Sequence, residues 1–480
     1  MGNSDSLKSQ QSKTEQAHFS NGLPILLMVA ATSFLGTFLI SSVNIALPAI
    51  GSDFSFSAVG LSWIVTSFLL ATALFMLPAG AWGDRYGSSR LFKMGLLIFT
   101  LSSLFCWLAP GGWWLIAARF LQGVGAAFTN TTGQVLLVSS YPAHKRGQVL
   151  GISVSAVYAG LALGPLLGGI LTLYAGWRSL FLIASLLGFA TLLLTLFRLK
   201  EPVRKRSHSS QSDAKGTLFF MGGLTALVYG STLIPSITGW SLMSGALLLL
   251  WFFWKHEKRT EHPLFEVSLF THNRLFTYSS LSALINYTAT FAIVFFLSLY
   301  LQKIQGLSPR DAGAVIITQP LMMTLFSPVV GRLSDRIEPR YFATAGMAIC
   351  SSGLAMLALI GSQTPIWVII AILVWVGLGF GLFSSPNMNT IMGSVVQSHY
   401  GQASGLAASM RVFGQIISMS VVTLLFTLYF GDLTVEAVEE HTFLTTMRIG
   451  FFIFALIGIP GIFFSYNRGD LRVKEKNDKR

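Results

Sequence analysis

The sequence predicts an all-α polytopic membrane protein with fourteen transmembrane helices, built from two related halves. Three observations predict this class. Hydrophobic residues make up 52% of the chain and charged residues only 11%, against about 25% charged in an ordinary soluble domain. Apolar stretches of about 20 residues, the length that crosses a bilayer core as a helix, recur along the chain. A turn framed by glycines around Asp84 is nearly repeated around Asp335, which points to duplication.

The apolar stretches give the expected spans in order. The alternative spanning fold, a β-barrel, is excluded because its strands alternate polar and apolar residues over about 10 positions. The seventh and eighth stretches are the shortest and are rich in Gly and Ser. The expected spans are residues 22–50, 58–79, 90–109, 113–138, 147–175, 177–198, 215–233, 238–254, 274–302, 309–330, 341–361, 365–390, 402–430 and 447–466.

Lysine and arginine give the orientation, because cytoplasmic loops carry an excess of both residues. With the N-terminus inside, 26 of the 32 basic residues fall in inner segments, 4 in outer segments, and 2, Arg119 and Arg411, within spans. The expected location is therefore the cell (inner or plasma) membrane with both termini cytoplasmic. This topology also accounts for the net charge of +13, so nucleic acid is excluded as a partner.

The spans divide the chain into five parts. Residues 1–21 form a cytoplasmic tail, 22–198 an N-terminal six-helix bundle and 199–273 two basic linkers around two extra helices; 274–466 form a C-terminal six-helix bundle and 467–480 a basic cytoplasmic tail. Duplicated halves usually hold a substrate site between them near the bilayer midplane and rock around it. Each half finds its partner within the chain, so a monomer in a lipid bilayer is expected.

The repeated turn is expected to join helix ends at the inner face. Glycines permit close approach of the two ends, and the adjacent carboxylate and guanidinium can pair charges there. A group at the interface need not face both sides of the membrane, so we interpret the turn as a conformational latch. The expected switch residues are Gly80, Asp84, Arg85, Gly87 and Arg90 in the first copy, and Gly331, Asp335 and Arg336 in the second.

The fifth span carries Gly160, Gly164, Pro165, Gly168 and Gly169. Glycines four residues apart share one helix face, so they predict close packing against another helix. Pro165 removes a backbone hydrogen bond and weakens the helix locally.

Arg119 and Arg411 are the two charges expected inside spans. A charged side chain at a helix centre costs about 2.5–3.5 kcal/mol or more, so such residues usually face a cavity or a partner. The functional interpretation is coupling or substrate binding. The structural alternative is an arginine bonded to backbone carbonyls.

Other polar side chains within spans are candidates for coupling or substrate binding, with interhelical hydrogen bonding as the alternative for each. Met322, Met323, Phe291, Phe295 and Phe296 are candidates for an adaptable apolar wall. The polar candidates are Asn44, Gln122, Tyr158, Asn286, Tyr287, Gln319, Asn387 and Gln415.

The order of these motifs resembles the fourteen-helix drug:proton antiporter family of the major facilitator superfamily, over essentially the whole chain. The resemblance is carried by the turn at 80–90, by 119–125 in span four, by 151–169 in span five, by 43–48 in span one and by 176–178 before span six. It implies the major facilitator fold, with two six-helix halves plus two inserted helices. It also implies multidrug efflux by alternating access, with protons as the coupling ion. Arg119 then lies in a motif associated with proton transfer, and the span-five glycines in one associated with export.

The sequence departs from this family at Leu39, where many members carry an acidic residue. Every Asp and Glu falls in a loop, terminus or helix-end turn, and all eight His residues lie outside the span centres. No ordinary titratable acid or imidazole is therefore expected at mid-membrane. Two buried arginines without a buried acid favour neutral or anionic substrates.

Enzyme motifs are absent from the sequence. There is no phosphate-binding loop for ATP, and no His, Cys and acid cluster with metal-ligand spacing. Cys106 and Cys350 lie in apolar stretches. We expect no enzyme activity, no cofactor and no metal. Three functions remain: an exporter of amphipathic drugs; a transporter of an anionic metabolite, siderophore or lipid bound by Arg119 and Arg411; and a receptor or scaffold on the same fold.

Overall fold

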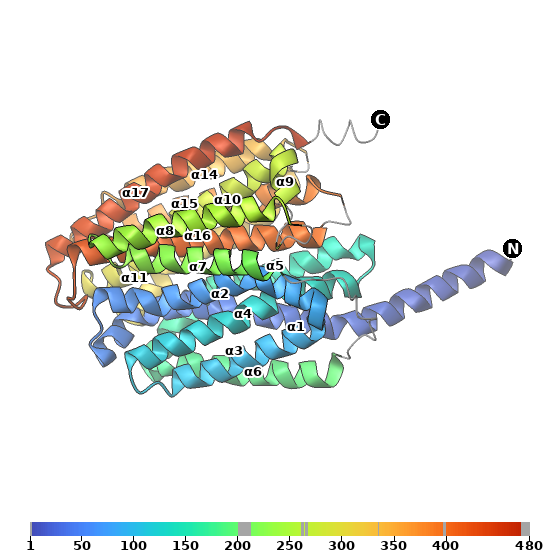
Figure 1. The fold of residues 1–480 in the computed structure, drawn as a ribbon, viewed down its shortest axis with the longest axis horizontal. Helices are drawn as coiled ribbons and strands as arrows, with labels where there is room; N and C mark the ends of the chain where they lie inside the picture. Colours follow the sequence, from blue (N-terminus) through green and yellow to red (C-terminus); the bar gives the residue numbers. More distant parts are fainter. Residues whose placement is uncertain are drawn as a thin grey trace.

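The protein is a bundle of roughly parallel and antiparallel helices (Figure 1). The computed structural model describes residues 2–199, 213–260, 264, 267–334, 336–396 and 400–471. The start of α1 and the end of α17 lie at the same end of the bundle. We call the opposite end of the bundle the distal end.

The described chain contains seventeen helices. The N-terminal half contains α1 (Gly2–Phe54), α2 (Ala58–Tyr86), α3 (Ser88–Trp107), α4 (Gly112–Ser140), α5 (Ala143–Ala175) and α6 (Arg178–Arg198). The inserted pair is α7 (Ala214–Ser231) and α8 (Ile237–Glu257). The C-terminal half contains α9 (Val267–His272), α10 (Arg274–Thr290), α11 (Ala292–Lys303), α12 (Pro309–Ile316), α13 (Thr318–Ser334), α14 (Pro339–Leu357), α15 (Ile366–Gly393), α16 (Tyr400–Tyr429) and α17 (Glu440–Asn467).

The expected all-α membrane architecture is confirmed. Two of the expected spans are each made of two helices, α10 with α11 and α12 with α13. Within the described chain, eleven helical segments are long and apolar enough to cross a bilayer. α4, α7 and α14 are not among them; α4 has a lower hydropathy because it carries Arg119, Gln122 and Gln134.

Three helix ends differ from the predicted span ends by seven residues or more, and one of them is the end of α2 at Tyr86 rather than at residue 79. α1 begins at Gly2 rather than at residue 22, and projects beyond the bundle (Figure 1). α17 begins at Glu440 rather than at residue 447. α1 and α17 extend into the polar residues before their apolar stretches, because backbone hydrogen bonding in a helix does not require apolar side chains. Glu440 in the first turn of α17 also interacts favourably with the positive end of the helix dipole.

Short polar residues start several of these helices. Ser57, Ser236 and Ser308 each accept a hydrogen bond from a backbone amide of the first turn of α2, α8 and α12, at 3.1, 3.1 and 3.2 Å. Asp213 and Asn273 do the same for α7 and α10. Such caps satisfy amides that the helix itself leaves without a partner.

The interruption between α12 and α13 has a local cause. Pro320 has no backbone N–H, so it cannot donate to the carbonyl of Ile316 four residues earlier. α12 ends at Ile316 and α13 begins at Thr318. The equivalent helix of the N-terminal half, α2, has Leu69 at the matching position and is continuous.

Glycine contacts between helices show that the two halves share a packing plan. A Cβ atom added to Gly125 of α4 would lie 2.5 Å from the backbone nitrogen of Phe99 and 2.6 Å from the carbonyl oxygen of Gly95 on α3. A Cβ atom added to Gly346 of α14 would lie 2.5 Å from the carbonyl oxygen of Gly379 on α15. Backbones that approach this closely need glycine.

A second pair of contacts repeats in the same way. Gly123 of α4 packs on the carbonyl of Phe68 in α2, and Gly377 of α15 packs on the carbonyl of Gln319 in α13, at 2.3 and 2.6 Å from an added Cβ. Gln319 follows Phe68 by the same 251 positions that separate Asp335 from Asp84 (319 − 68 = 335 − 84). The duplication predicted from the turn therefore extends to the helix contacts.

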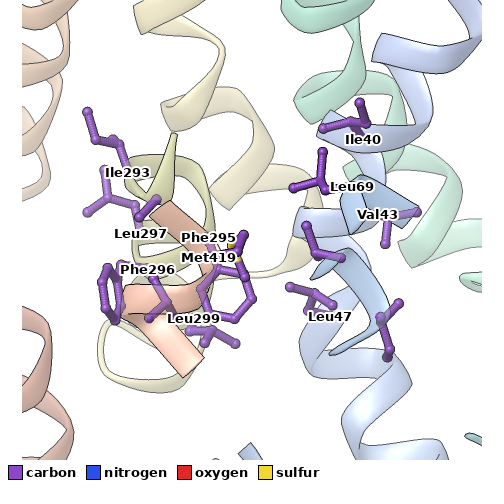
Figure 2. Packing of buried hydrophobic residues seen from close by; sticks show 14 of the residues in the cluster. Ile40, Val43, Leu47, Leu69, Ile293, Phe295, Phe296, Leu297, Leu299 and Met419 are labelled. Carbon is purple, nitrogen blue, oxygen red and sulfur yellow. The ribbon is translucent and has the colours of Figure 1, made fainter. Parts of the chain in front are cut away.

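The halves meet through α1 with α11, α2 with α16, and α5 with α12. Figure 2 shows the buried apolar side chains at this meeting place, with Leu47 and Leu69 on one side and Phe295 and Met419 on the other. The inserted helices α7 and α8 pack on each other, and α7 also contacts both α2 and α16. The inserted pair therefore lies beside a junction between the halves.

We predict that Gly125→Ala lowers the free energy of unfolding by about 1–3 kcal/mol, the usual cost of overpacking, because the added methyl group would meet backbone atoms of α3. The measurement is the thermal unfolding midpoint of the purified protein. Gly36→Ala is the control, since nothing lies within 4 Å of its added Cβ. Equal midpoints for the two variants would contradict the close α3–α4 contact.

Candidate functional site

A cavity lies between the two halves, partway along the bundle. Its volume is about 80 Å³, below the roughly 300–1,000 Å³ of sites that hold drug-sized ligands. Helices α1 and α5 supply one side, and α10, α11, α13, α15 and α16 the other. The lining residues are Ile40, Ser41, Asn44, Leu161, Pro165, Tyr287, Thr290, Phe291, Val294, Gln319, Pro320, Met323, Phe380 and Gln415.

Four of the polar candidates from the sequence line this cavity: Asn44, Tyr287, Gln319 and Gln415. The side-chain nitrogen of Asn44 donates to the carbonyl of Ile40 at 3.1 Å. Among the described residues, neither Oδ1 of Asn44 nor Oε1 of Gln319 has a hydrogen-bond partner, and both atoms are buried. No lining residue is acidic or basic, so the cavity offers apolar walls and neutral hydrogen-bonding groups.

The apolar wall is partly as expected. Phe291 and Met323 line the cavity, and the Tyr287 and Phe380 rings lie edge to face at 5.5 Å. Phe295 and Phe296 instead belong to a buried aromatic cluster and do not reach the cavity.

Tyr158 and Arg411 lie beside the cavity rather than in its lining. The Tyr158 hydroxyl shares a hydrogen bond with the hydroxyl of Ser384 on α15, which links α5 to the other half. Tyr287 lies close enough to both Tyr158 and Arg411 for their charges to influence its hydroxyl. Side chains from α5, α10, α15 and α16 therefore form a polar cluster between the halves, made of Tyr158, Tyr287, Ser384 and Arg411.

Arg119 lies elsewhere, inside the N-terminal half and fully buried. Its Nε donates to the carbonyl of Ile64 at 3.2 Å, and another nitrogen donates to Oε1 of Gln122. Gln122 in turn donates to the hydroxyl of Ser103 at 2.6 Å. The guanidinium also lies 4.4 Å from the ring centre of Phe68. Backbone and amide oxygens and an aromatic face thus stabilise this charge, and the structure does not bring Arg119 to the cavity.

The span-five glycines show the expected close packing. Atoms of α1 lie within 2.3–2.5 Å of a Cβ added at Gly160, Gly164 or Gly168. A Cβ added at Gly169 would lie 2.3 Å from the carbonyl oxygen of Pro309 on α12. Pro165 lines the cavity, and its carbonyl oxygen contacts Gly313. α5 therefore packs on α1 with one face and on α12 of the opposite half with another.

The hydrogen bonds between described residues of the two halves lie mostly at the distal end. The hydroxyls of Ser62 and Thr423 are 2.9 Å apart, and the amide of Ala58 donates to the carbonyl of Leu433 at 2.9 Å. The hydroxyl of Ser298 donates to the carbonyl of Asn44 at 2.6 Å, next to the cavity. These contacts close the bundle at its distal end.

The repeated turn is shorter than expected in its first copy. α2 continues through Gly80, Asp84 and Arg85 to Tyr86, and α3 begins at Ser88, so Gly87 alone connects them. Its φ of +98° requires glycine. Asp84, Arg85 and Arg90 are exposed at these helix ends, away from the cavity.

In the second copy the turn is longer, since α13 ends at Ser334 and α14 begins at Pro339. Asp335 lies outside the described residues, and Arg336 is exposed. A Cβ added to Gly331 would lie 2.7 Å from the Ser385 hydroxyl, so α13 approaches α15 closely there.

Asn286 and Asn387 are buried within the C-terminal half and do not line the cavity. Asn387 accepts a hydrogen bond from Arg468 at 2.9 Å. The sequence places Arg468 in an exposed basic tail, but the structure leaves only 1% of it exposed. Burial lowers the pKa of Arg468 to about 10, so it stays protonated at neutral pH.

Sequence reasoning missed Arg468 because a positive charge directly after the last span looks like an ordinary cytoplasmic residue. It also missed Ser384, Thr290 and Pro320, since single small residues in a span carry no signal of their own. Among the described residues, no group of three or more His, Cys, Asp and Glu side chains could hold a metal ion.

Comparisons with known proteins agree with this architecture. The chain is 32% identical over 408 residues to the riboflavin transporter RibZ of Clostridioides difficile (strain 630), covering 85% of this chain and 88% of that protein. It is 31% identical over 410 residues to the multidrug resistance protein Stp of Mycobacterium tuberculosis (strain ATCC 25618 / H37Rv), covering 83% and 75%. It is 29% identical over 415 residues to the methylenomycin A resistance protein of Bacillus subtilis (strain 168), covering 85% and 88%.

A solved structure shares the fold. The crystal structure of a bacterial homologue of the human lysosomal transporter Spinster, in an inward-facing and unoccupied conformation, matches with a TM-score of 0.67 at 15% identity, covering 94% of this chain and 96% of that chain. The family model described as Major Facilitator Superfamily matches residues 27–419. The repeated turn, the duplicated helix contacts and the cavity between two halves thus have a common explanation: the chain belongs to the major facilitator superfamily.

Proposed function

We propose that this secondary transporter exports amphipathic small molecules across the cell membrane by alternating access, as a monomer. The observation that carries the proposal is the cavity between the halves, closed at the distal end by the Ser62–Thr423 and Ser298–Asn44 contacts. Lysine and arginine counts predict that the distal end faces outward. On that topology the distal contacts must separate for the substrate to leave the cavity outward.

The relatives support export. Two of them are named for multidrug resistance and for methylenomycin A resistance, and another is named for riboflavin transport. The cavity suits such cargo, because apolar walls with few polar groups bind amphipathic compounds with little dependence on their shape. Its small volume in this conformation implies that the halves separate when a drug-sized compound enters.

Proton coupling is part of the proposal, and it needs a route without a mid-membrane carboxylate. Leu39 is fully buried among apolar residues, at a position where many antiporters have an acid. Asp84 at the end of α2 is the described carboxylate most closely tied to the repeated turn. We propose that Asp84 contributes to the conformational switch, while the substrate binds in the cavity.

A second candidate function is transport of an anionic metabolite, siderophore or lipid. The position of Arg411 beside Tyr287 favours it, whereas Arg119 lies outside the cavity lining.

Purified protein in liposomes tests the proposed function. We expect counterflow of at least one amphipathic compound from a panel of cationic, neutral and anionic drugs. Concentrative flux should disappear when a protonophore collapses the pH gradient, because the gradient supplies the free energy. Counterflow of no compound would contradict transport, and flux that is indifferent to the gradient would contradict proton coupling alone.

A disulfide across the distal end tests alternating access. The Ser62→Cys/Thr423→Cys pair joins α2 to α16 where the native hydroxyls are 2.9 Å apart. Oxidation should abolish transport and reduction should restore it, since the halves can no longer separate at that end.

The Ser33→Cys/Ser153→Cys pair is the matched control, because its hydroxyls are 3.5 Å apart on α1 and α5 of the same half. Transport by the oxidised Ser62→Cys/Thr423→Cys protein at the rate of this control would argue against opening at the distal end.

Asp84→Asn should reduce the transport rate about tenfold or more, the effect of losing one charge-assisted hydrogen bond, while substrate affinity changes little. Transport assays and equilibrium binding on the same preparation separate the two effects. Asp432→Asn, an exposed carboxylate at the distal end, removes the same charge as a control. An equal loss of affinity and rate in Asp84→Asn would place this residue in the substrate site instead.

A further inference from the structure

The two arginines within spans have opposite surroundings. Arg119 is fully buried, donates to oxygens of Ile64 and Gln122, and lies over the ring of Phe68. Arg411 is half-buried and forms no hydrogen bond, ion pair or ring contact with any residue that the structure describes. Two of the three guanidinium nitrogens of Arg119 thus have partners among the described residues, Nη2 has none there, and the charge also lies over an aromatic ring, whereas Arg411 has no such contact.

The position of Arg411 along its helix makes the lack of a partner for its charge significant. In the 30-residue α16, Arg411 lies three to four residues from the helix centre, which is about 5 Å at 1.5 Å per residue, so a bilayer core about 30 Å thick centred on the helix would contain it. An unpaired charge at such a depth is costly, so it usually faces a water-filled cavity or a partner. No described Asp or Glu is a partner of Arg411, and every Asp and Glu of the sequence falls outside the span centres.

Arg411 borders the central cavity. Gln415, one helical turn further along α16, lies on the same face of the helix and lines the cavity. Gly414 lets α16 approach α10 closely, since a Cβ added there would lie 2.8 Å from Cβ of Tyr287. Tyr287 also lines the cavity and interacts electrostatically with Arg411. Arg411 is thus one helical turn nearer than Gln415 to the start of α16, which is the end away from the distal contacts.

The hydroxyl groups of Tyr158 and Tyr287 lie near Arg411. Tyr158 interacts with Tyr287 and shares a hydrogen bond with Ser384, so the two phenols and the arginine come from α5, α10 and α16. A guanidinium with neighbouring O–H donors matches a carboxylate, which only accepts hydrogen bonds. The apolar residues of the cavity wall include Phe291, Met323 and Phe380.

We propose that Arg411, together with the hydroxyls of Tyr158 and Tyr287, forms an anion subsite, and that the transported compounds include amphipathic monoanions. The acidic group binds Arg411, and the apolar body lies against Phe291, Met323 and Phe380. The unpaired amide oxygens of Asn44 and Gln319 accept hydrogen bonds from N–H or O–H groups on that body. The inference rests on the proposed function in taking this cavity as the transport site.

Three probes that share one ring system test the subsite: 2-naphthylacetate, its neutral amide, and (2-naphthylmethyl)trimethylammonium. Equilibrium binding of the tritiated probes to purified protein in nanodiscs is measured at neutral pH. We expect the wild-type protein to bind the anion most tightly. Arg411→Gln should weaken binding of the anion about tenfold or more, the effect of losing a charged hydrogen bond, and should leave the amide within about twofold. Arg411→Lys should recover part of the loss.

Arg274→Gln is the matched control, because it removes the same charge from an exposed position at the start of α10. Its affinities should equal those of the wild type, and thermal unfolding midpoints confirm that each variant is folded. Equal affinity of the wild type for anion and cation, no binding of any probe, or an unchanged anion affinity in Arg411→Gln would overturn the anion subsite.

The proposed function fails in a different way. Anion binding that depends on Arg411 but without counterflow of any compound would leave the subsite standing and remove the transport proposal. Counterflow of drugs by a protein that binds the three probes without charge preference would support the transport proposal and overturn the anion subsite.

Discussion

Close backbone contact at glycine is the constraint on which the rest of this structure depends. Lipid is as apolar as leucine, so helices in a bilayer gain little from burying apolar side chains against each other. They associate instead through dense packing and interhelical hydrogen bonds. Gly125 of α4 packs against α3, Gly379 of α15 against α14 and Gly164 of α5 against α1. The hydroxyls of Thr37 and Ser41 add hydrogen bonds to carbonyls of α5. These contacts fix the helix packing of each half, which we call its frame. The cavity lies where the two frames do not fill the space between them.

The frame also decides how the buried charges are stabilised. Without acids in the spans, Arg119 relies on a backbone carbonyl, an amide and aromatic faces within its own half. Arg468 relies on Asn387 and on the nearby charge of Glu338. Both arginines hold helices of one half together. Arg411 lies between the halves, where its surroundings change when the halves move.

The sequence predicts the frame better than the site. Glycines at fixed spacing, apolar length and the repeated turn are local patterns, so the spans, the duplication and the face of α5 that meets α1 can be predicted from them. The cavity depends on which side chains of α1, α5, α10, α13 and α16 face the same space, and no local pattern records that. Gln122 and Asn387 looked like cavity residues, but each is instead the partner of an arginine. The burial of Arg468 depends on how α17 packs beyond its apolar stretch, which charge counting cannot detect.

The interruptions at Phe291 and Ile317 give the two halves different mechanics. Both fall in the C-terminal half, next to cavity residues Thr290 and Pro320, whereas α1 and α2 run without a break past the same depth. The duplicated halves share the glycine contacts between helices, but they differ in whether the helices beside the cavity are continuous. Each break is one residue long, and Phe291 and Ile317 keep helical dihedral angles, so both spans continue in the same direction. Pro320 removes one backbone hydrogen bond beside the cavity, so the α12–α13 span can bend there more easily than the continuous α2.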